Sequence, residues 1–260
     1  MRFEANQQVF DSVADQYDDL ALKPAEQAVL RRLAPRLPEL EMLDIGVGAG
    51  RTGYTYAPLV RRYVGIDYAP RMLARAQALL GDEPNVTLLL ADARDLSGVR
   101  GPFDFVLFSF NGIDTVGHED RLRILAEVRG VLKPEGLFQF STHSLGALPL
   151  DDAIAHPARR MSSLAYRVYT RVDDIRRRRR IHRVNASLSL EEARRRGWTI
   201  VKGRGHDFRL DDYYVDPSYQ VRQLTEAGLE TVAVYDCRGK PVQLPHRGRD
   251  AWLDYLCRPA

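Results

Sequence analysis

Three glycines at alternate positions after an apolar segment constrain the fold of this chain more than any other feature. Residues 42–50 read MLDIGVGAG, so an apolar run reaches Asp44 and is followed by Gly46, Gly48 and Gly50. Glycine has no Cβ, so a loop of this kind can turn sharply off a strand and approach a ligand closely. The pattern predicts a turn that binds a nucleoside cofactor on a parallel sheet.

A second acid narrows the kind of cofactor. Asp67 ends the apolar run 63–66 and lies 19 residues after Gly48, where a carboxylate would accept hydrogen bonds from a ribose. Residues 48–53 also satisfy the G-x-G-x-x-G pattern of dinucleotide-binding folds. Asp44 separates the two cases, because its negative charge would repel a pyrophosphate but attract an amino group. The sequence therefore favours a cofactor that carries an ammonium group.

Further strands and one helix follow in regular order. Residues 88–93 predict a third strand with an acid at its end, and this acid, Asp92, is suited to receive an adenine amino group. The other predicted elements are a strand over 103–111, a helix over 121–132, a turn over 133–136 and a strand over 137–141.

This order of parts resembles the class I methyltransferases, which use S-adenosylmethionine (SAM) and release S-adenosylhomocysteine. The matching motifs are D-x-G-x-G-x-G from Asp44, the acid Asp67, the pair Asp92-Ala93 and the L-K-P-x-G turn over 132–136. The resemblance implies an α/β doubly wound sheet of seven strands, mostly parallel with the last strand antiparallel. It also implies that the chain is a SAM-dependent methyltransferase.

The resemblance assigns most of the cofactor site. The glycine loop would lie under the methionine part, Asp67 would bind the ribose hydroxyls, and Asp92 with Ala93 would face the adenine. The full set of expected cofactor residues is Tyr17, Asp44, Gly46, Gly48, Gly50, Asp67, Tyr68, Met72, Asp92, Ala93 and Ser109.

Length and composition fit one core domain with an insertion. The chain has 260 residues, of which 45% are hydrophobic. We expect an N-terminal lid over 1–23, a cofactor-binding core over 24–145, a substrate-recognition insertion over 146–216 and a completion of the core over 217–260. No apolar run approaches 18 residues and no signal peptide is visible, so a cytoplasmic protein without a membrane span is expected. The scattered histidines and two cysteines predict no metal site.

The segment from Phe10 to Asp18 has two interpretations. It resembles the family's leading helix, which often closes over the cofactor, with Tyr17 as the expected contact. Its apolar residues Phe10, Val13, Ala14 and Tyr17 also have helical spacing, so they could simply pack on the core.

The sequence says less about the identity of the methyl acceptor than about the cofactor. Arg176 to Arg180 form a basic run, which is either a solvated helix face or a patch for an acidic substrate or RNA. The net charge is only +3, so the surface as a whole does not carry the strong positive charge that would indicate a nucleic-acid partner. We therefore predict a small-molecule acceptor with an oxygen or nitrogen nucleophile. An RNA methyltransferase and a non-catalytic SAM-binding regulator are the alternatives, and the oligomeric state is left open.

The region after residue 197 predicts a hairpin and the end of the sheet. Strands are expected over 198–201 and 208–210, followed by a helix over 217–227 and by strands over 230–236 and 251–257. Tyr213 and Tyr214 are expected to line the acceptor pocket.

Histidine is the expected general base, since it titrates near neutral pH. His143 follows the fifth strand, at the edge where open α/β sheets bind ligands, and is the first choice. His206 and His118 are the other candidates. Asn111 and Asp114 follow the fourth strand and are expected to bind or orient the acceptor.

Overall fold

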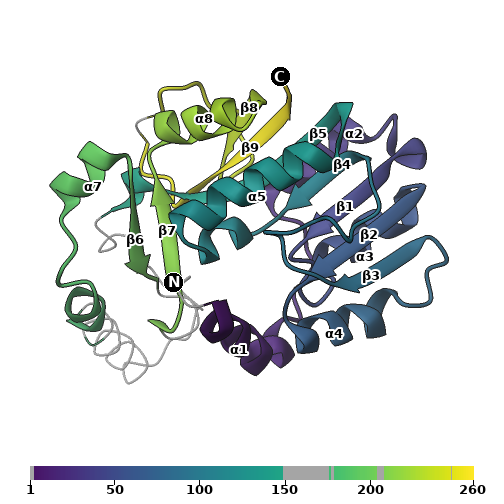
Figure 1. Ribbon diagram of the computed structural model, residues 1–260, viewed down its shortest axis with the longest axis horizontal. Coiled ribbons are helices and arrows are strands. Elements are labelled where there is room, and N and C mark those ends of the chain that lie inside the picture. The colour runs from purple at the N-terminus through teal and green to yellow at the C-terminus, as the bar shows by residue number, and fades with distance from the viewer. Residues whose placement is uncertain (1–2, 149–175, 177–178, 204–207, 247) are drawn as a thin grey trace, which may run out of the picture.

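The computed structural model describes every residue except 1–2, 149–175, 177–178, 204–207 and 247. Its centre is a nine-stranded sheet in which five parallel strands have the order β3-β2-β1-β4-β5 (Figure 1). These strands are β1 (Glu41–Ile45), β2 (Arg62–Asp67), β3 (Val86–Leu90), β4 (Phe103–Phe108) and β5 (Leu132–Ser144).

The carboxyl-terminal strands complete the sheet as predicted. Strand β9 (Trp252–Pro259) runs antiparallel to β5, and β8 (Leu229–Asp236) pairs antiparallel with β9. The expected fold class, a mostly parallel sheet whose last strand is antiparallel, is therefore confirmed.

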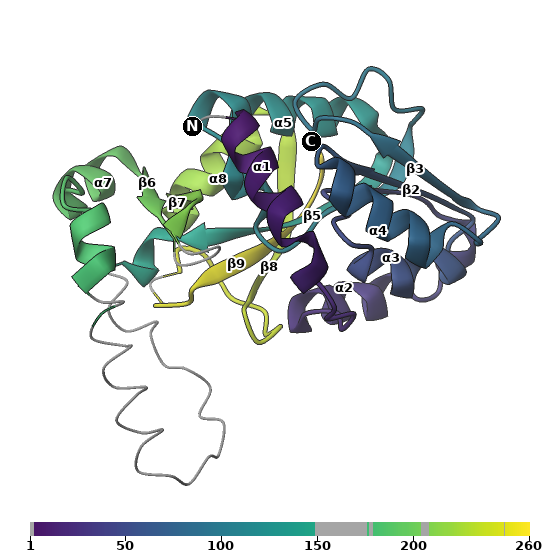
Figure 2. The same ribbon diagram turned by 90° about the horizontal axis from the view of Figure 1, so that it is seen from below.

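Helices cover both faces of the sheet (Figure 2). One face carries α2 (Pro24–Leu33), α3 (Arg51–Tyr56) and α4 (Pro70–Leu80), and the other carries α5 (His118–Val131) and α8 (Pro217–Glu226). Neighbouring residues of β1 contribute to opposite faces, since Met42 packs with Val29 and Leu80 while Leu43 packs with Ile124 and Val128. Burial on both faces explains why these strands are continuous apolar runs.

The predicted turn over 133–136 lies inside β5. Phe103 of β4 pairs with Leu132, and Phe105 pairs with Leu137, so the four residues between them bulge out of the pairing. A Cβ on Gly136 would lie 2.9 Å from the carbonyl oxygen of Phe103, so the bulge needs glycine there.

A two-stranded hairpin extends the sheet, and its second strand differs from the prediction. Strand β6 (Trp198–Lys202) pairs antiparallel with β7 (Asp211–Val215), so the strand predicted over 208–210 was wrong. Phe208 has a φ of 61°, which is not extended. Strand β7 also pairs with the end of β5 through His143 and Tyr214, and this pairing brings the hairpin to the carboxyl edge of the sheet.

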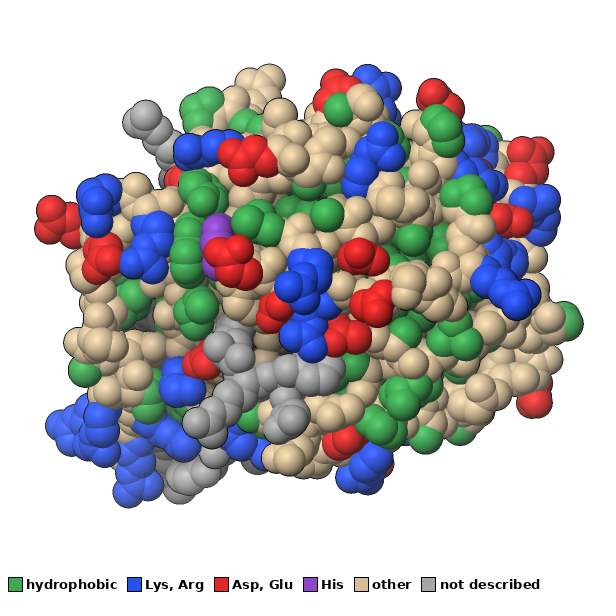
Figure 3. Space-filling model, in the orientation of Figure 1, with side chains coloured by type: hydrophobic (Ala, Val, Ile, Leu, Met, Phe, Trp, Pro, Cys, Tyr) green, Lys and Arg blue, Asp and Glu red, His purple; other side chains and the backbone are tan. Residues whose placement is uncertain are grey.

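The remaining described helices lie at the amino terminus and near the hairpin: α1 (Phe3–Val13), a 3-10 turn (Ala14–Gln16) and α7 (Leu190–Arg196). Arg176, Arg179 and Arg180 of the basic run are exposed, while 177 and 178 lie outside the described residues. Figure 3 shows Lys and Arg side chains gathered at the lower left edge of the molecule, well below the position of α7 in Figure 1. No helix in the described ranges has the length and apolar content of a membrane span.

Close packing of α3 on the sheet leads to a stability prediction at Gly53. A Cβ there would lie 2.4 Å from Leu80 Cδ1 and 2.8 Å from the hydroxyl of Tyr63. We expect Gly53→Ala to lower the free energy of unfolding by about 1–2 kcal/mol in urea titrations, because the buried neighbours must move. Gly130→Ala is the control, since Gly130 is an exposed helical glycine with nothing within 4 Å of a new Cβ. It should stabilise by about 0.5–1 kcal/mol, and equal effects of the two variants would contradict the packing argument.

Candidate active site

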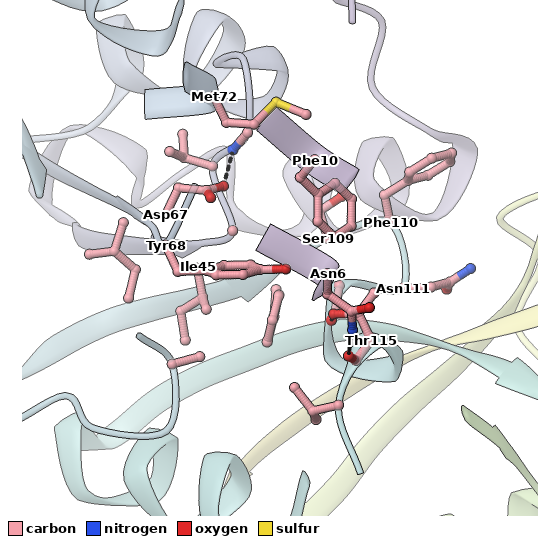
Figure 4. Close-up of a pocket in the computed structure, with 18 of the residues that line it drawn as sticks. Asn6, Phe10, Ile45, Asp67, Tyr68, Met72, Ser109, Phe110, Asn111 and Thr115 are labelled. Atoms are coloured by element: carbon pink, nitrogen blue, oxygen red, sulfur yellow. Dashed lines mark hydrogen bonds between the residues drawn. The ribbon is translucent and has the colours of Figure 1, made fainter. Parts of the chain in front are cut away.

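A cavity of about 500 Å³ opens at the carboxyl ends of the central strands. The glycine loop after β1, Asp67 after β2 and Asp92 after β3 line one part of it. The segment after β4 and the ends of β5, β7 and β9 line the other part. Figure 4 shows Asp67 and Met72 on one side of the cavity and Phe110 and Asn111 on the other, with Asn6 and Phe10 of α1 between them.

The glycine loop bends as the sequence predicts. Gly46, Gly48 and Gly50 have φ values of 66°, 57° and 95°, which favour glycine. The backbone N–H of Gly48 donates to Asp67 Oδ2 at 2.9 Å, and the N–H of Ala69 donates to Oδ1 at 2.8 Å. Each carboxylate oxygen retains a second lone pair, so Asp67 can also accept from the hydroxyls of a ribose in the cavity.

Asp44 lies beneath this loop and outside the cavity lining described here. It is fully buried and accepts hydrogen bonds from the hydroxyls of Thr52 and Tyr63. Burial raises its pKa to about 6, although these hydrogen bonds oppose the shift. Oδ1 has no hydrogen-bond partner among the described residues. Asp44 therefore stabilises the start of the loop, and direct contact with a cofactor stays a prediction.

The third predicted acid is paired with a neighbouring cation. Asp92 and Ala93 line the cavity as expected. Arg94 forms an ion pair with Asp92 at 2.6 Å and reaches Asp120 of α5 at 3.3 Å. This pairing orients the carboxylate of Asp92 beside the position expected for an adenine.

A buried ion pair beside the glycine loop was missed by the sequence analysis. Glu26 of α2 is 2% exposed and forms two hydrogen bonds with the guanidinium of Arg51, at 2.6 and 2.7 Å. Ser109, a predicted cofactor residue, donates to Glu26 and accepts from Arg51 at 2.5 Å. Glu26 lies 25 residues before Arg51, so no local motif connects the two.

The amino-terminal segment lines the cavity and also packs on the core, and closure of this segment over a cofactor stays a prediction. Phe10 and Tyr17 line the cavity and also pack against the cluster of Val13, Ala14 and Met72. Burial, with a smaller contribution from the charge of Asp67, raises the pKa of Tyr17 to about 12. The amide of Asn6 donates to the carbonyl of Thr115 at 2.5 Å, and this bond ties α1 across the cavity.

His143 lines the other part of the cavity and is paired with Asp114. Nδ1 of His143 lies 2.8 Å from Asp114 Oδ2, and the amide of Asn111 lies 3.2 Å from Nε2. Burial favours the neutral ring, but the hydrogen bond and charge of Asp114 outweigh it and raise the pKa of His143. When Nδ1 donates to Asp114, the neutral ring carries a lone pair on Nε2 and can accept a proton there.

Asp114 itself is placed differently from the prediction. It is fully buried and accepts from the backbone N–H of His143 at 2.6 Å and from Arg121 at 2.6 Å. Asp114 is absent from the described cavity lining, so it orients His143 and does not contact an acceptor in the cavity. Asn111 does line the cavity, and its Oδ1 has no hydrogen-bond partner in the described part of the chain.

Three other predicted residues, Gly50, His118 and Tyr213, lie outside the described lining of the cavity. His118 begins α5, stacks on Trp198 at 4.3 Å and contacts the hydroxyl of Tyr213 at 2.8 Å. Side chains alternate along β7, so Tyr213 points away from the cavity while Tyr214 lines it and stacks on His143 at 4.8 Å. His206, the third candidate base, lies outside the described residues.

The comparisons with known proteins agree with this geometry. A family model for a methyltransferase domain matches residues 42–136. The putative methyltransferase YqeM of Bacillus subtilis is 28% identical over 138 residues, which cover 52% of this chain and 56% of that protein. The ubiquinone/menaquinone biosynthesis C-methyltransferase UbiE of Citrifermentans bemidjiense is 32% identical over 152 residues, which cover 53% of this chain and 63% of that protein. The matched region thus spans less than two thirds of these relatives.

Similarity to solved structures extends over the whole chain. The 1,6-didemethyltoxoflavin-N1-methyltransferase of Burkholderia thailandensis has a TM-score of 0.60 and 15% identity, and the match covers 99% of this chain and 88% of that one. At this identity the likeness concerns the fold. Residues 42–136 are therefore similar to a methyltransferase domain, and the chain has the fold of the class I methyltransferases that its motifs resemble.

Proposed function

We propose that this chain transfers a methyl group from SAM to an oxygen or nitrogen atom of a small-molecule acceptor. One observation carries the proposal: the glycine loop, Asp67 and His143, which is paired with the buried Asp114, meet at a single cavity. Its volume of about 500 Å³ lies in the range of small-molecule sites.

The residues present fit the cofactor. Gly48 lines the cavity, and a Cβ there would approach only the carbonyl oxygen of Gly46, at 3.9 Å, so the loop leaves room for a ligand. Asp67 would hold the ribose, Asp92 with Ala93 would face the adenine, and the loop would support the methionine part. Tyr17, Tyr68, Met72 and Ser109 also line the cavity and complete the proposed contacts.

The protein's contribution is to align the acceptor and to remove its proton. When bound, SAM supplies a methyl group already activated by the sulfonium. The chain must hold the acceptor atom in line with that carbon and exclude water, for which α1 provides the proposed lid. Nε2 of His143 accepts the acceptor's proton, and Asp114 stabilises the resulting imidazolium. Asn111 orients the acceptor beside Nε2.

A small acceptor is supported by the surroundings of the cavity. The Burkholderia thailandensis protein of the same fold binds 1,6-didemethyltoxoflavin together with S-adenosylhomocysteine. The described arginines of the run at 176–180 do not line the cavity of this chain, so the geometry does not favour the RNA alternative.

Calorimetric titration with SAM, S-adenosylhomocysteine and NAD tests the cofactor. We expect adenosyl binding without NAD binding, and Asp67→Ala should weaken it about ten- to a hundredfold because ribose hydrogen bonds to a charged group are lost. Asp95→Ala is the control, since that exposed carboxylate does not line the cavity. Binding of NAD alone, or equal affinities of the two variants, would overturn the assignment.

A further inference from the structure

The acceptor part of the cavity contains an unpaired carboxylate, Asp212 of β7. No ion pair or hydrogen bond connects it to another side chain in the described part of the protein. The other carboxylates of the lining have partners: Asp19 with Lys23 at 2.9 Å, Asp92 and Asp120 with Arg94 at 2.6 and 3.3 Å, and Asp67 with the backbone N–H groups of Gly48 and Ala69. Asp212 is therefore the carboxylate that a ligand would have to satisfy.

Asp212 lies on the same face of β7 as Tyr214, two residues away, and both line the cavity. Burial raises the pKa of Asp212 to about 6, and the charge of His143 opposes this shift while Asp114 and Asp211 add to it. Above pH 6 the side chain carries a negative charge in a half-buried position. Holding an unpaired charge there costs free energy, and a bound cationic ligand would remove that cost.

Two aromatic residues on the neighbouring strands line the same cavity. His143 of β5 is in register with Tyr214 of β7 on one side and with Trp252 of β9 on the other. Residues in register point to the same face, and Tyr214 and Trp252 both line the cavity. Tyrosine and tryptophan rings attract cations through their faces, so the rings and Asp212 favour the same kind of ligand.

We propose that the acceptor is an amine whose ammonium group is bound by Asp212 in the part of the cavity lined by Tyr214 and Trp252, an inference that rests on the proposed methyltransferase function. Nε2 of His143 takes one proton from the ammonium, which frees the nitrogen lone pair. That lone pair forms the new N–C bond, while the electron pair of the broken C–S bond stays on the sulfur. Asp212 thus selects an amine over an alcohol of the same shape.

Matched amine and alcohol probes test this inference by binding, without turnover. Trp198→Phe leaves Trp252 as the fluorescent reporter, since the chain has two tryptophans. With S-adenosylhomocysteine at saturation, phenethylamine is compared with 2-phenylethanol, and cyclohexylamine with cyclohexanol. We expect each amine to bind at least about tenfold more tightly, because only the amine forms a charged hydrogen bond with Asp212.

The Asp212→Asn variant should lose this preference. The amines should bind about ten- to a hundredfold more weakly, while the affinities for the alcohols and for S-adenosylhomocysteine stay unchanged. Asp211→Asn is the control, because Asp211 pairs with Lys202 at 2.9 Å and lies outside the described cavity lining.

Two kinds of failure are distinguishable. Normal binding of S-adenosylhomocysteine without any amine preference, or with a preference that survives Asp212→Asn, would overturn the amine assignment alone. Loss of S-adenosylhomocysteine binding in the parent protein would instead overturn the proposed function.

Discussion

Replacing His143 by alanine is expected to lower the rate of methyl transfer by about two to four powers of ten, the usual contribution of a general base. The affinity for S-adenosylhomocysteine should change little, since His143 lies at the other part of the cavity from Asp67. Single-turnover assays with an amine acceptor measure the rate, and calorimetry measures the affinity. An unchanged rate would contradict the assignment of His143 as the base.

The pH dependence gives an independent check on the same residue. A base must be neutral to accept a proton, so the rate should fall as the pH drops below the pKa of His143. Burial opposes the charged ring, but Asp114 raises this pKa above the ordinary value of 6.5, so the midpoint of the acid limb should lie above pH 6.5. His118→Ala is the control, because that ring stacks on Trp198 outside the described cavity lining. A loss of the acid limb in His118→Ala would reverse the assignment.

Local patterns were sufficient to place most residues of the proposed cofactor part at one cavity. The glycine loop and the acids Asp67 and Asp92 each follow a strand directly, so chain order alone places them at one edge of a parallel sheet. Tyr68 and Met72 follow Asp67 closely and line the cavity with it. The turn of a strand into a loop is a local property, and the sequence therefore predicts it well.

Residues whose position depends on pairing between distant segments were harder to predict. Tyr213 and Tyr214 are adjacent, and only the register of β7 against β5 decides which of them faces the cavity. Asp212 was overlooked for the same reason, although it shares a face with Tyr214. Glu26 reaches Arg51 across packed elements, and no periodicity in the sequence indicates that contact.

The role predicted for Asp114 also depends on contacts between distant segments of the chain. Its place after β4 predicted contact with the acceptor, and it is indeed close to the acceptor part of the cavity. The carboxylate of Asp114 accepts hydrogen bonds from the backbone N–H of His143 in β5 and from the side chain of Arg121 in α5. A pair formed between the 3-10 turn after β4 and the end of β5 is a tertiary feature, so the sequence could place both residues without relating them.

Replacing Arg121 by methionine is expected to lower the free energy of unfolding by about 3–5 kcal/mol, because it removes one partner of a buried ion pair. Arg121 is fully buried and donates to Asp114 at 2.6 Å and to Gln220 at 2.6 Å, with its guanidinium 4.7 Å from the centre of the Tyr213 ring. Arg123→Met on the same helix is the control, since Arg123 is exposed and should change stability by less than about 0.5 kcal/mol. Urea unfolding measures both, and equal stabilities would contradict the role of the pair.

A double-mutant cycle separates the ion pair from general packing. If the cost of Arg121→Met comes from the uncompensated charge of Asp114, then Asp114→Asn should recover part of it, and the double variant should lose less stability than the sum of the single variants. The pH profile connects this pair to the chemistry, because the charge of Arg121 lowers the pKa of His143. In folded Arg121→Met the acid limb should therefore move to higher pH, whereas a purely structural defect would lower the rate at every pH alike.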